Sequence, residues 1–109
     1  MINLSLRVKA SQANRDGMLK VLRALLGPMR VSPGCLSCQL HQDVENSNML
    51  TLIEEWETEE SLRAHVRSVD FGRVLAVLDM SSKPPEIKVN TISNTACMEG
   101  MEAIEAMRS

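Results

Sequence analysis

Trp56 and His65 are the side chains whose types and spacing are best suited to chemistry. Trp56 is the only tryptophan, and His65, one of two histidines, follows nine positions later. A strand-like run ends at Trp56, and Thr58 is a good helix N-cap, so His65 is expected on the apolar edge of the helix that follows. Because imidazole titrates near neutral pH, His65 is suited to remove a phenolic proton beside an indole.

Each candidate also has a purely structural interpretation. A large indole can anchor the core of a small domain, and a histidine beside an apolar stripe is often a buried, hydrogen-bonded residue. Glu54, on the same predicted strand face as Trp56, is a second polar candidate. Arg7 and Arg73 are candidates to stabilise an oxyanion, although such side chains are mostly solvated. The residues alone leave both interpretations open.

The cysteines and histidines lack the spacing of a redox or metal site. Cys35 and Cys38 form a C-x-x-C pattern, but residues three apart on a strand point to opposite faces, so we interpret both as small buried hydrophobic residues. A zinc-type site needs three or four convergent ligands, and His41, His65 and nearby carboxylates match no such spacing. We interpret Cys97 as incidental, and we expect no metal and no disulfide framework.

Composition limits the class of protein. The 109 residues, 44% hydrophobic and 24% charged, predict one globular domain. A net charge of −2 and only two aromatic residues, Trp56 and Phe71, argue against a nucleic-acid partner. No apolar run approaches the roughly 18 residues of a membrane span, and the first residues lack a signal-peptide pattern. We therefore expect a cytoplasmic protein without a membrane partner.

Hydrophobic periodicity predicts the order β-α-β-β-α-β. The first predicted helix is expected to end or kink at Gly27-Pro28, because proline lacks the amide donor. The second is expected to begin at Thr58 and to be interrupted at 70–72. Four segments alternate apolar and polar residues as strands do, namely 2–9, 35–44, 49–56 and 87–91.

The simplest fold with this order is a ferredoxin-like α+β domain, in which both helices cover one face of a four-stranded antiparallel sheet. The other face is expected to be of mixed apolar character, with residues such as Cys38, Thr51 and Ile53 or their neighbours. Burial of that face against a second copy predicts a homodimer. We assign residues 1–93 to this domain, and 94–109 to a tail that forms a short, methionine-rich helix.

Three segments resemble one protein family, namely PGCLSCQLHQDVENSN, LIEEWETEESLRAH and KPPEIKVNTIS. They are similar to the antibiotic biosynthesis monooxygenase domain, in the branch that includes quinol monooxygenase. The resemblance runs from about Ile2 to Ser93. It implies a ferredoxin-like monomer that pairs through its sheet into a dimeric α+β barrel, with a pocket between sheet and helices. Some members oxidise phenols or quinols with molecular oxygen and need neither metal nor flavin, so no cofactor is expected.

The resemblance extends to only some of the family's site residues. Trp56 matches the active-site tryptophan, and His65 matches the histidine of the bacterial branch. Leu52 stands where polyketide-oxidising members have asparagine. Cys38 and His41 stand where tyrosine is frequent.

Haem-degrading members carry an axial histidine at a position that is Leu75 here. Asn3 does resemble the asparagine that those members use. Without the iron ligand, haem degradation is only the third hypothesis.

Residues and resemblance together predict a cofactor-independent monooxygenase acting on a small quinol or phenolic aromatic molecule, with His65 and Trp56 as catalytic residues. The main alternative is a non-catalytic small-molecule-binding or stress-related dimer on the same scaffold. The residues expected to bind substrate are Asn3, Leu52, Glu54, Phe71 and Arg73.

Overall fold

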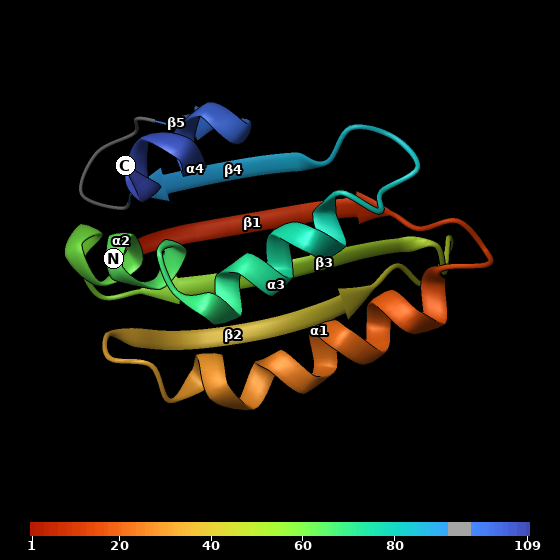
Figure 1. The fold of residues 1–109 in the computed structure, drawn as a ribbon, viewed down its shortest axis with the longest axis horizontal. Coiled ribbons are helices and arrows are strands. Elements are labelled where there is room, and N and C mark those ends of the chain that lie inside the picture. Colours follow the sequence, from red (N-terminus) through yellow and green to blue (C-terminus); the bar gives the residue numbers. More distant parts are fainter. Residues whose placement is uncertain (92–96) are drawn as a thin grey trace.

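Five antiparallel strands form one sheet in the computed structural model, which describes residues 1–91 and 97–109 (Figure 1). The strand order is β2-β3-β1-β4-β5. The strands are β1 (Ile2–Lys9), β2 (Cys35–Gln42), β3 (Met49–Trp56), β4 (Glu86–Thr91) and β5 (Cys97–Glu99). The helices are α1 (Arg15–Arg30), α2 (Glu59–Val66), α3 (Val69–Leu78) and α4 (Met101–Arg108). The predicted ferredoxin-like α+β fold is confirmed for β1 to β4, with the second predicted helix divided into α2 and α3.

Strand β1 lies in the middle of the sheet because its strict alternation gives it one fully apolar face. Its residues pair with β3 on one side and with β4 on the other, so that Leu6 faces both Leu52 and Ile87. All three side chains are buried beneath the helices. This shared apolar face fixes the register, since a slip of one residue would turn the apolar set to solvent.

Helix α1 continues through Gly27-Pro28 to Arg30, so the predicted end at that point is wrong. Pro28 lies in the last turn, where its missing amide removes only the bond to the carbonyl of Ala24. Met29, the next residue, is fully buried. Packing of Met29 in the core therefore outweighs the local cost of the proline.

Helices α2 and α3 each begin at a hydroxyl cap. Thr58 and Ser61 form a capping box at the start of α2, and Ser68 accepts a hydrogen bond from the amide of Phe71 at the start of α3. The predicted interruption at 70–72 is wrong, because these residues lie inside α3. The break comes earlier, at Arg67 and Ser68, where the second cap restarts the helix.

The sheet face turned away from the helices is polar rather than of mixed apolar character. Cys38 is not on it, since its side chain is buried on the helix-covered face opposite Glu54. Met49 and Ile53 are the apolar residues of β3 on the open face, which they share with Thr51 and Glu55. The other residues that the register places there are Asn3, Ser5, Arg7, Lys9, Ser37, Gln39, His41, Glu86, Lys88 and Asn90.

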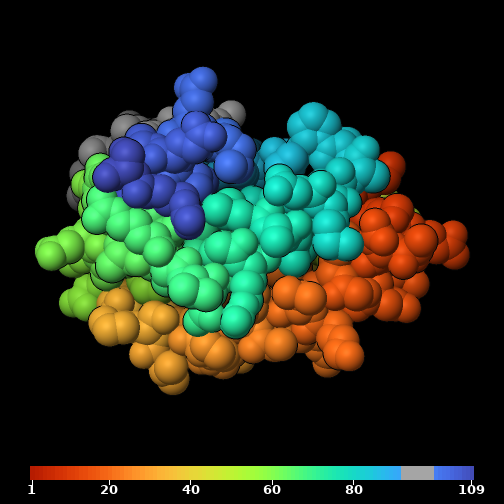
Figure 2. Space-filling view, in the orientation of Figure 1, coloured from red at the N-terminus to blue at the C-terminus, as the bar shows by residue number. Residues whose placement is uncertain are grey.

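The C-terminal segment adds strand β5 and helix α4 to the predicted core. Ile104 and Met107 of α4 are buried, and Arg67 donates a hydrogen bond to the Met107 carbonyl at 3.1 Å. In Figure 2 the C-terminal segment lies directly against the α2 segment. The pattern at 94–109 predicted the helix but not β5, and the predicted domain boundary after residue 93 falls outside the described residues.

No helix in the described part of the chain is long and apolar enough to cross a membrane.

Candidate active site

Trp56 and His65 come into direct contact, as the end of β3 and the last turn of α2 meet. The capped turn at Thr58 starts α2 two residues after β3 ends, so His65 is carried back over the strand. The indole and imidazole rings stack with centroids 4.3 Å apart and an interplanar angle of 27°. Trp56 is fully buried and His65 is 5% exposed. The spacing of nine residues thus gives an enclosed ring pair.

Glu54 completes this cluster from the same strand face. Its side chain is 0% exposed, and Oε1 accepts a hydrogen bond from Trp56 Nε1 at 3.0 Å. The same oxygen lies 2.8 Å from His65 Nε2. A buried carboxylate is costly unless it is paired and hydrogen-bonded, and here the indole and the imidazole compensate it. Glu54, Trp56 and His65 therefore form one unit, which we call the Glu-Trp-His cluster.

The Glu-Trp-His cluster has unused hydrogen-bonding capacity. Despite the short distance to Glu54, His65 Nε2 makes no aligned hydrogen bond, and Glu54 Oε2 has no partner among the described residues. The 2.8 Å separation is a close polar contact, which becomes an ion pair only when His65 takes up a proton. Buried polar atoms without partners are rare in folded proteins. Glu54 Oε2 thus keeps an unused acceptor position inside the buried cluster.

Phe71 and Leu52 form the apolar surroundings of the cluster. The Phe71 ring meets the His65 ring edge-on, with centroids 5.1 Å apart at 76°. Leu52 lies on the same strand face as Glu54 and is 2% exposed. Aromatic and aliphatic neighbours lower the local dielectric, which strengthens the interaction of the imidazole with the carboxylate.

The other candidates lie apart from this cluster. Asn3 pairs with Glu55 and Asn90 on the open face of the sheet, opposite to the cluster. Arg73 is exposed on α3 and forms an ion pair with Asp70 at 3.4 Å. The structure thus brings four of the proposed substrate-binding and catalytic residues together around His65, and it places these two elsewhere.

Neither Arg7 nor His41 reaches the cluster. Arg7 lies 3.7 Å from Asp43 in an exposed ion pair. His41 is exposed and contacts Gln39 at 3.0 Å. Among the described residues, no group of three or more histidines, cysteines or acidic residues is arranged to hold a metal ion.

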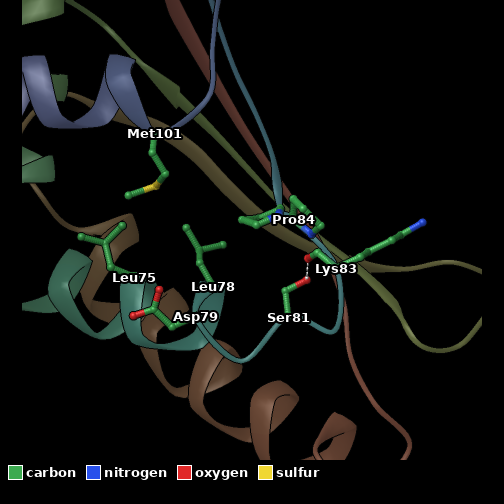
Figure 3. Close-up of a pocket in the computed structure, with 8 residues that line it drawn as sticks. Leu75, Leu78, Asp79, Ser81, Lys83, Pro84 and Met101 are labelled. Carbon is green, nitrogen blue, oxygen red and sulfur yellow. Dashed lines mark hydrogen bonds between the residues drawn. The ribbon is translucent and has the colours of Figure 1, made fainter.

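A cavity of about 400 Å³ lies between the end of α3, the loop that follows it and the start of α4 (Figure 3). Leu75 and Leu78 face Met101 across it, and Ser81 donates a hydrogen bond to the Lys83 carbonyl at 2.6 Å at its rim. Glu54, Trp56 and His65 do not line this cavity. Haem-degrading members have an axial histidine where this chain has Leu75, and the Leu75 side chain contributes only an aliphatic surface to the cavity. The complete lining is Leu75, Leu78, Asp79, Ser81, Lys83, Pro84, Pro85 and Met101.

Cys38 borders the cluster, because β2 places it directly opposite Glu54. Burial, together with the nearby charges of Glu54 and Cys35, raises the pKa of the Cys38 thiol from 9.0 to about 12. The thiol therefore stays protonated at neutral pH and offers little thiolate for nucleophilic attack.

This raised pKa predicts a loss of stability at high pH. Between pH 9 and 12 the unfolded state releases the Cys38 proton while the folded state keeps it, so stability falls as pH rises through this window. Between pH 8 and 10, the reduced wild-type protein should lose on the order of 1 kcal/mol more unfolding free energy than Cys38→Ala. Urea unfolding at both pH values measures this difference, and equal losses in the two proteins would contradict it.

The sequence model of the antibiotic biosynthesis monooxygenase family matches residues 1–77, a stretch that contains the whole Glu-Trp-His cluster. The chain belongs to this family. The match ends within α3, so β4, β5 and α4 lie beyond it.

Solved structures show the same fold. A protein from Methanosarcina mazei is 26% identical, with a TM-score of 0.74 over 81% of this chain and 88% of that one. A structure described as an antibiotic biosynthesis monooxygenase matches at 21% identity, with a TM-score of 0.76 over 84% of this chain and 97% of that one. At this identity the second likeness establishes the fold alone.

Among curated proteins, an uncharacterised protein from Synechocystis is 25% identical over 89 residues. The alignment covers 81% of this chain and 60% of that protein. The chain therefore spans about three-fifths of the length of this relative.

Proposed function

We propose that this family member oxidises a small quinol or phenolic aromatic molecule with O2, without a metal or organic cofactor. A quinol and one O2 give one hydroxyquinone and one water. One oxygen atom forms a new C–O bond on the ring, and the other leaves as water when the O–O bond breaks. The ring supplies all four electrons that O2 accepts, so the reaction needs no further reductant.

The proposed first step is removal of a phenolic proton by His65. The electron-rich phenolate then passes one electron to O2, and the resulting radical pair combines at a ring carbon. The peroxide formed in this way loses water, with the imidazolium returning its proton to the departing hydroxide. Proton transfer of this kind contributes about 10²–10⁴-fold to the rate of an enzyme.

The observation that carries this proposal is the buried contact between Glu54 and His65. A carboxylate 2.8 Å from Nε2 stabilises the imidazolium that forms when His65 takes the proton. Glu54 Oε2, which has no partner, can accept a hydrogen bond from the second hydroxyl group of a quinol. Trp56 and Phe71 supply aromatic surfaces against which a planar ring can stack.

Enclosure of the cluster suits this chemistry. The His65 and Glu54 side chains are 2% and 0% exposed, so a substrate reaches them only when neighbouring side chains move aside. Once closed, such a site excludes water that would otherwise protonate the phenolate or intercept the peroxide.

Oxygen consumption under chelation tests the proposed reaction. Chelator-treated wild-type protein should consume O2 when supplied with hydroquinone or with its methylated and naphthalene analogues, and 18O2 should place one labelled oxygen in the product. Uptake no faster than buffer across the whole panel would overturn the proposal. Hydrogen peroxide formation with an unlabelled product would overturn the oxygen insertion step.

The cavity of Figure 3 favours a second candidate, a non-catalytic binding protein. Its volume of about 400 Å³ and its leucine, methionine and proline lining suit a small apolar ligand, and ligand sites commonly have about 300–1,000 Å³. Met101 lines the cavity and is 40% exposed, so an arginine there should block the cavity without burying a charge in the core. Quinol binding that is lost in Met101→Arg, without any oxygen consumption in the wild-type protein, would favour this function over the first.

We also propose that the open sheet face pairs with a second copy of the chain. Lys88 and Glu55 both lie on this face, so a two-fold arrangement can match opposite charges. Sedimentation velocity should then give twice the chain mass of 12.1 kDa. A particle of 12.1 kDa at micromolar concentration would contradict the dimer.

A further inference from the structure

The two cysteines of the C-x-x-C segment of β2 do not point to the strand faces that the sequence predicts. Cys35 pairs with Trp56, and Cys38 pairs with Glu54, while the register shifts between Cys35 and Ser37. This β-bulge leaves Leu36 without a pairing position and 53% exposed. Trp56 and Glu54 share the helix-covered face, so Cys35 and Cys38 share it too. The expectation that they point to opposite faces is wrong, because an extra residue restores the same-face relationship.

The bulge brings the two cysteines to neighbouring positions on one strand face. Same-face neighbours are about 6.6 Å apart along a regular strand. A disulfide needs its two Cβ atoms about 3.5–4.5 Å apart, so closure requires the two side chains to move together at the bulge. The Cys35 thiol donates a hydrogen bond to the Ser37 carbonyl oxygen at 3.5 Å. That carbonyl carbon is bonded to the Cys38 nitrogen. The Cys35 sulfur therefore already points along β2 towards Cys38.

The two thiols also differ in accessibility, as an attacking and a resolving thiol must. Cys35 is partly exposed, whereas Cys38 is only 1% exposed and lies beside Glu54. Within the sheet formed by residues 1–91 and 97–109, β2 is at the edge and pairs only with β3. A small adjustment at the bulge therefore breaks no second ladder of hydrogen bonds.

We propose that Cys35 and Cys38 form a peroxide-responsive dithiol, which closes to an intramolecular disulfide across the bulge. Hydrogen peroxide oxidises the Cys35 thiol to a sulfenic acid and leaves as water. The small thiolate fraction of Cys38 then attacks the Cys35 sulfur, and the hydroxide that departs takes up the Cys38 proton to give a second water. Overall, two thiols and one hydrogen peroxide give one disulfide and two waters, with two electrons passing from sulfur to oxygen.

The surroundings make this dithiol slow to oxidise. Burial, followed by the charge of Glu54, raises the pKa of the Cys35 thiol, and the same causes raise that of Cys38. Oxidation should therefore be slower than that of an exposed free thiol, and faster at alkaline pH, where the thiolate fraction grows. Weakly acidic thiols also leave a disulfide reluctantly, so the bond should persist until a strong dithiol reductant is added.

Mass spectrometry of the wild-type protein tests the proposal. Trypsin releases both cysteines in the single peptide 31–63 and Cys97 in the separate peptide 89–108. After peroxide treatment and alkylation under denaturing conditions, peptide 31–63 should lose two hydrogen atoms and take up no alkyl group. Dithiothreitol should restore both alkylation sites. Trp56 lies opposite Cys35, so its fluorescence should change at the rate at which the disulfide forms.

Single substitutions complete the test. Cys38→Ser should remove the two-hydrogen loss and leave Cys35 as a sulfenic or more oxidised acid, whereas Cys97→Ser should behave as the wild type does. Two alkylated cysteines in peptide 31–63 after peroxide treatment would overturn the proposal. A disulfide that joins peptides 31–63 and 89–108, or two copies of either, would overturn it as well.

Discussion

Trp56→Ala is expected to lower the free energy of unfolding by about 3–5 kcal/mol. The indole is fully buried, stacks on His65 and donates the hydrogen bond to Glu54. Its loss leaves a large cavity and removes a compensating donor from a buried carboxylate. Domains of this size are stable by only about 5–15 kcal/mol, so the variant should be close to unfolding at room temperature. Urea unfolding followed by far-UV circular dichroism measures the change.

Trp56→Phe separates packing from hydrogen bonding. The phenyl ring keeps most of the stacking surface but cannot donate to Glu54, so we expect a loss of about 1–3 kcal/mol. An exposed-site control is Val44→Ala, which should change stability by less than about 0.5 kcal/mol because Val44 is fully exposed. If Trp56→Phe unfolds at the wild-type urea concentration, the Trp56–Glu54 bond contributes nothing to the fold.

Glu54→Leu and His65→Leu are each expected to cost about 3–5 kcal/mol, because each leaves one member of a buried pair without its partner. The double variant should cost less than either single one. Replacing both members of a buried pair by hydrophobic residues is often nearly neutral. Thermal and urea unfolding of the four proteins in this cycle give the coupling between the two side chains.

The neighbouring residue Glu55 provides a matched control for this cycle. Its side chain lies on the open sheet face, away from His65, so Glu55→Leu combined with His65→Leu should be additive. Additive effects for Glu54 and His65 as well would show that the 2.8 Å contact contributes no coupling energy.

The sequence predicts much of the local structure of the site. Alternation along β3 places Glu54 and Trp56 on one face, and the Thr58 cap starts the helix that carries His65. These features depend on residues close together in the chain. The contact between Glu54 and His65 was not predictable, because it depends on how α2 packs against the sheet. That angle is set by the whole core rather than by any local pattern.

Two other features of the structure differ from the prediction because they also depend on contacts between distant parts of the chain. The β-bulge at Leu36 is a property of the pairing between β2 and β3, so the C-x-x-C pattern alone did not indicate it. The continuation of α1 past Pro28 depends on the burial of Met29 beneath the helix. Both show tertiary packing overriding a local preference.

In the proposed mechanism His65, in contact with Glu54, acts as the base in an oxygen-dependent oxidation. The most direct test compares kcat/KM for oxygen consumption in His65→Gln and His41→Gln, with the quinol that gives the fastest uptake in the wild-type protein. His41 is the chain's other histidine and is exposed on the open sheet face. We predict a loss of about 100-fold or more in His65→Gln and wild-type activity in His41→Gln. Wild-type activity in a folded His65→Gln protein would contradict the account.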